Sequence, residues 1–294
     1  MHRHRFVLLA IVLVAAPLAA PGCSTNALTG KRNFMLISPS EDITLGQQAA
    51  PGVSGELGGP YGDPVMKQYV QAVGRKVAAE ALKSGSYEYP FTFDVLDTDV
   101  VNAFALPGGP IFVTRALLFQ MQDESELAGV LAHEVTHVAA RHSAQAISKQ
   151  VGAEIVLSVL KTAAGEKASG TAGTAADLAK VVGGLISLKY TRDNETESDT
   201  FGTQFAVQAG YTPAGLIRVM EMFMQQEAAS GGSGGPAFLR THPYPDDRIV
   251  NIRNVIAKKY PSALTDPRLA AGREAYQQNV LSRKSLLKQY SKAK

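Results

Sequence analysis

The segment His133-Glu134-Val135-Thr136-His137 holds three side chains whose types and spacing could carry out hydrolysis. On a helix, histidines four residues apart project from one face, so both imidazoles could bind a single Zn²⁺. Glu134 lies beside them and could take a proton from the attacking water. The pattern therefore predicts the core of a zinc peptidase.

The residues around this motif favour a helix that could carry it. Asp123 followed by Glu126 is typical of a capping box at a helix start. Leu127 and Val130 indicate that the turn before the motif is buried, and we expect the helix to continue toward Ile147. The alternative, two surface histidines on an ordinary amphipathic helix, is disfavoured by this apolar neighbourhood.

A catalytic zinc site needs three protein ligands and one open position, so another side chain must join the two histidines. The residues after His137 lack the glycine and third histidine of the metzincin pattern. His142 would lie about 180° from His133 on a continuous helix and could not share its metal. We therefore expect a distant carboxylate as the third ligand.

Residues 195–199, Glu-Thr-Glu-Ser-Asp, supply candidate carboxylates. Glu195 and Asp199 are four residues apart on a predicted helix over 192–209, so one could bind the metal while the other hydrogen-bonds a ligand histidine. Glu197 would point to the far side of that helix. We interpret it as part of a solvated acidic face.

Together these motifs resemble those of the gluzincin zinc metallopeptidases that include HtpX, the CAAX prenyl protease and BepA. That family pairs its histidine motif with a later Glu-x-x-Ala-Asp, and Ser198 stands here where alanine is usual. The resemblance also takes in Asn102-Ala103-Phe104, His242-Pro243 and Arg248, so it spans residues 64 to about 260.

The resemblance implies a role for each of these side chains. Asp199 would support a ligand, and Glu134 would act as general base. Arg248 or His242 could donate a hydrogen bond to the developing oxyanion. The ligands of one Zn²⁺ per chain would be His133, His137 and Glu195.

His242 has two further interpretations. It follows a glycine-rich linker over 231–235 and precedes Pro243, so it lies on a segment that can swing. Histidine is the commonest metal ligand, so His242 could occupy the open zinc position until substrate displaces it. It could also be a loop residue with no contact to the metal.

A small antiparallel sheet is predicted before the metal helix. Residues 91–96 alternate and are β-rich, and residues 102–113 have the pattern of a hairpin that turns at Pro107-Gly108-Gly109. An extended substrate could add to the edge of such a sheet, with Asn102, Ala103 and Phe104 as its contacts. Either strand could instead belong only to the core.

Helical patterns dominate the rest of the chain, so we predict an α+β fold, mostly α, of the zincin-like metallopeptidase type. Besides the metal helix they cover residues 64–81, 151–162, 176–188, 192–209, 213–228 and 245–259, with a glycine-rich loop over 165–174. The predicted organisation is a signal peptide (1–22), a lipid-anchored tether with one short helix near 41–48 (23–62), a metallopeptidase domain (63–260) and a loosely packed C-terminal tail (261–294).

The N-terminus has the pattern of a secretory signal. Arg3 and Arg5 precede the almost wholly apolar residues 6–20, and small residues follow. This stretch is too short for a comfortable membrane span, which needs about twenty residues. We predict that residues 1–22 are removed on secretion.

Cys23 is the one cysteine of the chain, so it cannot form an intramolecular disulfide. Its position after Ala20-Pro21-Gly22 resembles a bacterial lipoprotein box, although leucine usually stands where Ala20 is. We predict an acyl anchor at Cys23 and, from Ser24, a periplasm-facing lipoprotein of the outer membrane. The alternative is an ordinary signal followed by an incidental cysteine.

Composition is consistent with one catalytic domain. A chain of 294 residues with 45% hydrophobic content can bury one sizeable core. The formal charge of +3 falls to about +1 without Arg3 and Arg5, so nothing suggests nucleic-acid binding.

The predicted function is that of a zinc-dependent endopeptidase of the bacterial cell envelope, cleaving extended or misfolded polypeptides in protein quality control. The first alternative is a chaperone or assembly factor for envelope proteins with the same fold, although the intact Glu134 argues against a purely non-catalytic version. A zinc hydrolase of small amides is a further alternative, but the predicted hairpin suits peptides. The sequence indicates neither the physiological substrate nor the oligomeric state.

Overall fold

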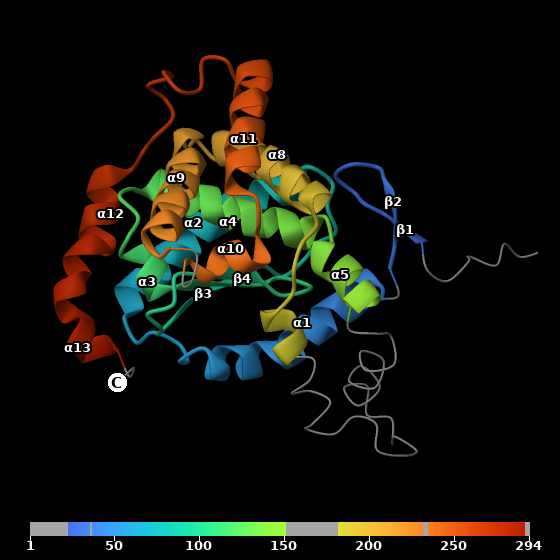
Figure 1. The fold of residues 1–294 in the computed structure, drawn as a ribbon, viewed down its shortest axis with the longest axis horizontal. Coiled ribbons are helices and arrows are strands. Elements are labelled where there is room, and N and C mark those ends of the chain that lie inside the picture. The colour runs from blue at the N-terminus through green and yellow to red at the C-terminus, as the bar shows by residue number, and fades with distance from the viewer. Residues whose placement is uncertain (1–22, 36, 151–181, 232–234, 292–294) are drawn as a thin grey trace, which may run out of the picture.

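The computed structural model describes residues 23–35, 37–150, 182–231 and 235–291, and its fold is built around one buried helix (Figure 1). This helix, α4 (Glu124–Ala139), carries the histidine motif, and every side chain from Ser125 to Ala139 is buried. The helices packed directly on it are α2 (Pro64–Lys83), α8 (Arg192–Gln208) and α9 (Ala214–Ala229), and α11 (Pro245–Lys259) packs on α8 and α9. The prediction of helices near these bounds is confirmed.

Helix α4 begins at Asp123, whose carboxylate accepts a hydrogen bond from the Glu126 backbone N–H at 3.2 Å. The Glu126 side chain accepts from the backbone of Gln122 instead of returning to Asp123, so only half of the predicted capping box forms. The helix ends at Ala139, and α5 (His142–Gln150) starts a new direction after Arg141, whose φ is 59°. The prediction of one helix continuing toward residue 147 is therefore wrong, because the left-handed backbone of Arg141 interrupts it.

The sheet has the order β3-β5-β4 and lies against α2 and α4. Strands β4 (Ala103–Ala105) and β5 (Pro110–Thr114) form the predicted antiparallel hairpin, but β3 (Thr92–Leu96) pairs with β5 in parallel. The prediction of an antiparallel sheet is wrong in this detail, because side-chain alternation has the same period of two in both kinds of pairing. The central strand β5 is buried at all five positions.

The segment before the domain is more ordered than the predicted tether. Strands β1 (Cys23–Thr25) and β2 (Arg32–Phe34) form an antiparallel hairpin, and α1 (Pro39–Glu56) is longer than the predicted short helix. Leu45, Ala49 and Val53 are fully buried along one face of α1. Because their spacing of four residues is helical, this face packs on the domain. Pro51 and the neighbouring glycines had instead suggested turns and loops in this segment.

The C-terminal segment is also packed on the domain, so the expectation of a loosely packed tail needs correction. It contains α12 (Arg273–Asn279), the 3₁₀ helix η1 (Leu281–Leu286) and α13 (Leu287–Tyr290), which lie along one side of the molecule in Figure 1. Tyr276 is fully buried, and its hydroxyl donates to the Leu118 carbonyl at 2.7 Å. A single buried aromatic residue of this kind supplies apolar contact to the domain. The many charged residues around it had suggested that the segment lacked such a contact.

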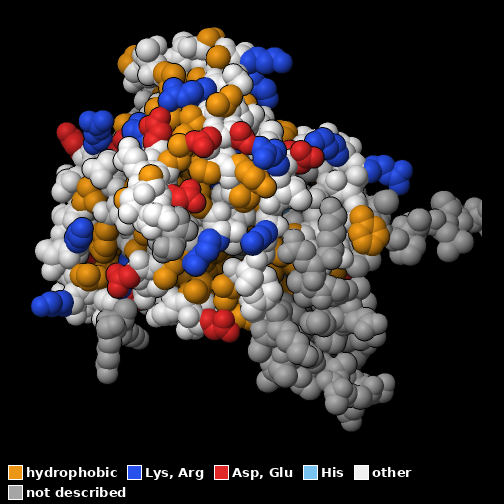
Figure 2. Space-filling view, viewed as in Figure 1, with side chains coloured by type: hydrophobic (Ala, Val, Ile, Leu, Met, Phe, Trp, Pro, Cys, Tyr) orange, Lys and Arg blue, Asp and Glu red, His pale blue; other side chains and the backbone are white. Residues whose placement is uncertain are grey.

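Some predictions lie outside the described residues: the signal peptide, the helix over 151–162, the glycine-rich loop over 165–174 and the first part, 176–181, of the helix over 176–188. Within the described part of the chain, no helix is both long and apolar enough to cross a bilayer. On the face drawn in Figure 2, basic and acidic side chains are interspersed over the helices, as the nearly balanced charge leads one to expect.

Candidate metal centre

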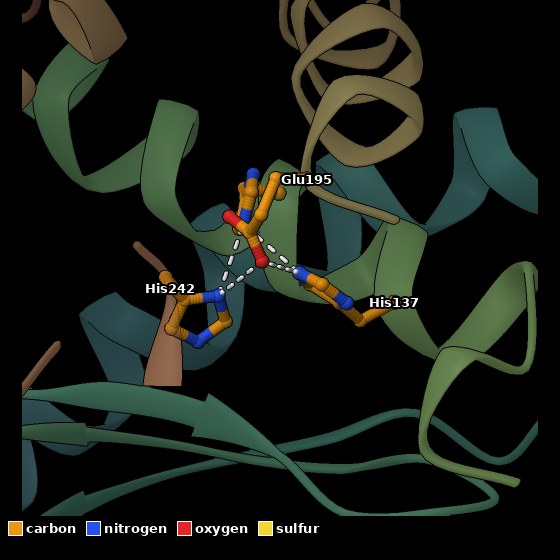
Figure 3. Close-up of side chains that lie close together, drawn as sticks. His137, Glu195 and His242 are labelled. Carbon is orange, nitrogen blue, oxygen red and sulfur yellow. Dashed lines mark hydrogen bonds and ion pairs between the residues drawn. The ribbon is translucent and has the colours of Figure 1, made fainter. Parts of the chain in front are cut away.

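Four side chains from three elements converge at the middle of α4. His133, His137, Glu195 and His242 each offer one ligand atom, and these atoms all lie within 4.8 Å of one another. The first two come from α4, Glu195 from α8, and His242 from the end of α10 (Ala237–Thr241). Figure 3 shows the Glu195 carboxylate between His137 and His242.

The distances within this cluster fit a tetrahedral metal ion. Ligand atoms about 2.1 Å from zinc lie about 3.4 Å from one another. Here the Nε2 atoms of His133 and His137 are 2.9 Å apart, and each lies 3.5 Å from a different Glu195 oxygen, Oε2 for His133 and Oε1 for His137. His242 Nδ1 lies 3.1 Å from Glu195 Oε1 and 3.4 Å from His133 Nε2. Nitrogen and carboxylate donors of this kind suit Zn²⁺.

A second set of contacts orients His133. Its Nδ1 lies 3.0 Å from Asp199 Oδ1, on the side of the ring away from the cluster. Arg248 donates to both oxygens of the same carboxylate, at 2.8 and 3.0 Å, and its Nη1 lies 3.1 Å from Glu195 Oε2. Because Arg248 can only donate hydrogen bonds and the Asp199 carboxylate accepts them, we assign the His133 Nδ1 hydrogen to the bond with Asp199.

Burial and neighbouring charges set the ionisation of the cluster. Burial raises the pKa of Glu134 above its usual value, which suits a group that must take up a proton. Burial, together with the neighbouring His133, holds the pKa of His137 well below its usual range, so that imidazole is neutral, as a metal ligand must be. Burial alone would raise the pKa of Glu195, but Arg248, His242 and His133 together outweigh it and keep that pKa well below normal.

Glu134 lies beside the four donors without binding any of them. Both of its carboxylate oxygens are buried and lack a hydrogen-bond partner among the described residues. Its Oε1 is 3.6 Å from His242 Nε2. Burying a carboxylate without such partners costs free energy of folding. The position of Glu134 therefore favours a role in contacting a bound molecule over a role in holding the fold together.

Two aromatic rings close the site. The His242 ring stacks on Phe238 with centroids 4.2 Å apart, and Tyr190 lies 3.9 Å from the His137 ring. His133, His137 and His242 are 0% exposed. A substrate could reach the donors only after the side chains that cover them, these two rings among them, move.

The predicted substrate-binding residues lie on the edge strand of the sheet. Ala103 is buried, and the Phe104 ring stacks on Phe112 at 5.3 Å. Asn102 precedes the strand, and its buried Oδ1 has no hydrogen-bond partner within the described chain. Because β4 pairs only with β5 among the described strands, its other edge has no strand partner in that part of the chain.

Two residues near the centre differ from their sequence interpretation. His142 lies next to the side chain of His137, with their Nδ1 atoms 3.1 Å apart, because the turn at Arg141 brings the start of α5 back toward α4. Glu197 is not a solvated acid: its side chain is 12% exposed and contacts His142 and Lys31. The proximity of His142 to the motif in the sequence was the one available signal.

Tyr190 and Phe238 carried no signal in the sequence, since isolated aromatic residues are usually core.

Comparison with known proteins gives a consistent assignment. A family model described as "Peptidase family M48" matches residues 64–256. The chain is 36% identical over 219 residues to the "Beta-barrel assembly-enhancing protease" of Yersinia pestis, covering 71% of this chain and 43% of the relative. The Escherichia coli (strain K12) protein of that name is 34% identical over 200 residues, which cover 65% of this chain and 39% of the relative.

A third relative is more nearly covered. "Metalloprotease YcaL" of Escherichia coli (strain K12) is 32% identical over 191 residues, which cover 63% of this chain and 70% of the relative. By contrast, the chain spans about two fifths of the length of the two assembly-enhancing proteases.

Proposed function

Because the chain belongs to peptidase family M48, we propose that it is a zinc-dependent endopeptidase of the bacterial cell envelope that cleaves extended or misfolded polypeptides. The observation that carries this proposal is the convergence of His133, His137 and Glu195 beside the unpartnered carboxylate of Glu134. The relatives described above are all named as proteases, which favours the peptidase over a chaperone or assembly factor.

The proposed zinc ligands in the active enzyme are His133, His137 and Glu195, with one ion per chain. When bound, zinc would supply a Lewis acid that polarises the scissile carbonyl and lowers the pKa of water. Two neutral imidazoles and one carboxylate are the donor set of many catalytic zinc sites. Asp199 would hold the His133 ring in position through the hydrogen bond to Nδ1.

Glu134 would act as the general base. Its carboxylate would accept a proton from the attacking water and pass it to the leaving amine. The raised pKa brings the side chain closer to the range in which it can both take up and release a proton near neutral pH.

His242 is proposed as the fourth ligand in the resting site. Its Nδ1 lies within 3.4 Å of both Glu195 and His133, at the corner that substrate and water would need. Stacking on Phe238 holds the ring there. Of the roles open to His242, the geometry supports the resting ligand best.

Arg248 is proposed to position the acids and not to serve as the oxyanion donor. Two of its nitrogens already donate to Asp199. The third, Nη1, lies beside Glu195 and is buried. The position of Arg248 therefore supports a role in holding the two buried carboxylates, Asp199 and Glu195, close together.

The substrate main chain is proposed to add to the free edge of β4, with Asn102, Ala103 and Phe104 as contacts. Strand addition would stretch a polypeptide beside α4 and the metal donors. An acyl anchor at Cys23 would keep the enzyme at the outer membrane, facing the periplasm.

The proposal is tested by replacing Glu134 with Gln. Proteolysis of denatured casein should fall by at least about 10²-fold, the scale expected for losing a general base, while bound zinc and the fold are kept. Chelator should abolish the wild-type activity. Asp193→Asn makes the same change from carboxylate to amide at an exposed position of α8 and should leave the rate unchanged. Undiminished cleavage by the Glu134 variant would contradict the mechanism.

A further inference from the structure

The ring of His137 points in two directions with different neighbours. Its Nε2 faces His133 and Glu195, and Figure 3 shows the other ring nitrogen turned away from that carboxylate. This second nitrogen, Nδ1, lies 3.1 Å from Nδ1 of His142. A histidine that binds a metal through one nitrogen nearly always donates its other N–H to an acceptor, which fixes the ring. For His133 that acceptor is Asp199, whereas for His137 the structure places a histidine there.

Only one arrangement of protons satisfies these contacts. If Nε2 of His137 binds a metal, its Nδ1 carries the hydrogen, and Nδ1 of His142 must accept it. His142 then carries its own hydrogen on Nε2, which lies 3.2 Å from Glu197 Oε2 and can donate to it. The Ser198 hydroxyl, 3.3 Å from His142 Nδ1, could also donate to that nitrogen. The contact with His137 thus requires Nδ1 of His142 to be an acceptor, and the Ser198 hydroxyl is compatible with that role because it can donate.

The backbone places His142 where this contact is possible. Arg141, in the turn between α4 and α5, adopts the left-handed conformation that is uncommon outside glycine. Its guanidinium donates to Asp42 at 2.6 Å and to the Ile37 carbonyl at 2.5 Å, so α1 and the segment before it hold the turn. His142 is 0% exposed as a result.

Glu197 is held by the N-terminal hairpin. Asn26 donates to its Oε2 at 3.2 Å, and Lys31 donates to its Oε1 at 2.7 Å. Asn26 is buried, and its side-chain oxygen Oδ1 accepts hydrogen bonds from the backbone N–H groups of Leu28 and Thr29. These bonds fix the orientation of the Asn26 amide. Lys31 is largely exposed, so Asn26 is the firmer of the two contacts.

We propose that His142 and Glu197 are positioning residues for the metal ligand His137, and that Asn26 of the N-terminal hairpin holds this pair in place. Neither residue reaches the reacting atoms. Their effect is to fix the His137 ring and its tautomer, as Asp199 does for His133. The inference rests on the proposed zinc site and extends the support of that site to a segment close to the predicted anchor.

The test compares two substitutions of His142 in the full mature chain. His142→Leu fills similar space without an acceptor, whereas His142→Asn keeps a carbonyl oxygen near the position of Nδ1. Zinc affinity, measured by competition with a chelator, should fall about 10- to 100-fold in the leucine variant, the scale for losing a contact behind a ligand. It should be largely restored in the asparagine variant. The visible spectrum of the Co²⁺-substituted protein should change in the leucine variant, because the ring of a ligand has moved.

Two further variants test the positioning roles of Glu197 and Asn26, and a third serves as a matched control. Glu197→Gln should weaken zinc binding in the same direction but less, since an amide oxygen can still accept. Asn26→Asp keeps the turn and replaces the donor facing Glu197 by a second carboxylate, so it should weaken zinc binding too. Asp193→Asn removes an equal charge from the same helix and also near Lys31, and it should leave zinc binding unchanged.

The outcomes separate this inference from the proposed function. If both His142→Leu and Glu197→Gln kept the zinc affinity and cobalt spectrum of the wild type, the positioning role of His142 and Glu197 would be overturned. The proposed zinc site would be unaffected. Equal losses in His142→Leu and His142→Asn would also overturn this positioning role, because shape and not hydrogen bonding would then be decisive. A wild-type protein that binds no zinc would overturn the proposed function, and the inference with it. Thermal unfolding of each metal-free variant shows whether a loss of affinity is only a loss of folding.

Discussion

At the scale of single residues, Glu195 and Glu197 lie two positions apart on α8 yet have different surroundings. Glu195 reaches into the cluster, where Arg248 and the neighbouring histidines together lower its pKa, whereas Glu197 points toward the N-terminal hairpin. Their difference follows from helix geometry, since residues two apart project about 200° from each other.

Replacing Glu195 with Gln should lower zinc affinity by more than about 100-fold, beyond the usual effect of a supporting residue, because a charged ligand is lost. Competition with a chelator measures this. The exposed Asp193→Asn substitution on the same helix is the control. If Glu197→Gln were to lose the metal while Glu195→Gln kept it, the third ligand would be wrongly assigned.

His242 offers a second test at this scale. As a resting ligand, its replacement by Ala should change the spectrum of the Co²⁺-substituted enzyme and leave activity equal or higher, because the substrate no longer has to displace it. Thr241→Ala, on the same turn, should do neither. An unchanged spectrum with a reduced kcat would indicate an oxyanion donor instead, and no change in either would remove His242 from the site.

At the scale of elements, the site depends on how closely α8 approaches α4. A Cβ atom on Gly202 would lie 3.0 Å from the His133 backbone nitrogen, so glycine is what allows the two helices to meet there. Glu195 and Asp199 reach the histidines from α8 across this contact. A residue without a side chain therefore sets how closely the proposed ligands on the two helices approach one another.

Gly202→Ala should thus lower both zinc affinity and the stability of the metal-free fold, by about 1–3 kcal/mol for overpacking. Chemical denaturation and chelator competition measure the two effects. Gly55→Ala is the matched control, since a Cβ there meets nothing within 4 Å and the position lies in α1. Zinc affinity equal to wild type in the Gly202 variant would show that the helices can move apart without cost to the site.

The sequence predicted those elements whose signals are local. Helical periodicity predicted α11 with the bounds that the structure shows, and it predicted α8 to within one residue at its end. The turn at Arg141 escaped prediction because its left-handed conformation depends on contacts with Asp42 and Ile37, about a hundred residues earlier in the chain. The direction of β3 escaped for a similar reason, since the alternating pattern is the same in parallel and antiparallel pairing.

The site was predicted to a comparable extent. Spacing alone was enough to single out His133, Glu134 and His137, and the later acidic motif pointed to Glu195. Tyr190 and Phe238 could not be predicted, because their contacts with ligand rings arise only when three separate segments fold together.

At the scale of the whole molecule, the segment after Cys23 folds onto the catalytic domain instead of hanging from it. Asn26 lies three residues after that cysteine and already contacts α8. If Cys23 is acylated, the domain would therefore sit close to the membrane surface, with little free chain between them.

Cys23→Ser should give a protein that no longer partitions with membranes, because the acyl chains are its predicted anchor. Membrane and soluble fractions from cells producing wild type and the variant measure this. Ser24→Ala changes the next residue without removing the acceptor thiol and should remain in the membrane fraction. An unchanged distribution of the Cys23 variant would mean that the cysteine is incidental.

The near-complete burial of the four donor side chains also governs how fast an ion can be exchanged. A chelator, like a polypeptide, would reach them only after the side chains that cover them, the Phe238 and Tyr190 rings among them, have moved. Tight retention of the metal would then reflect a slow exit as well as a strong bond. The off-rate of the ion and the entry rate of the substrate would depend on the same conformational step. A measurement of either rate could therefore report the rate of that step.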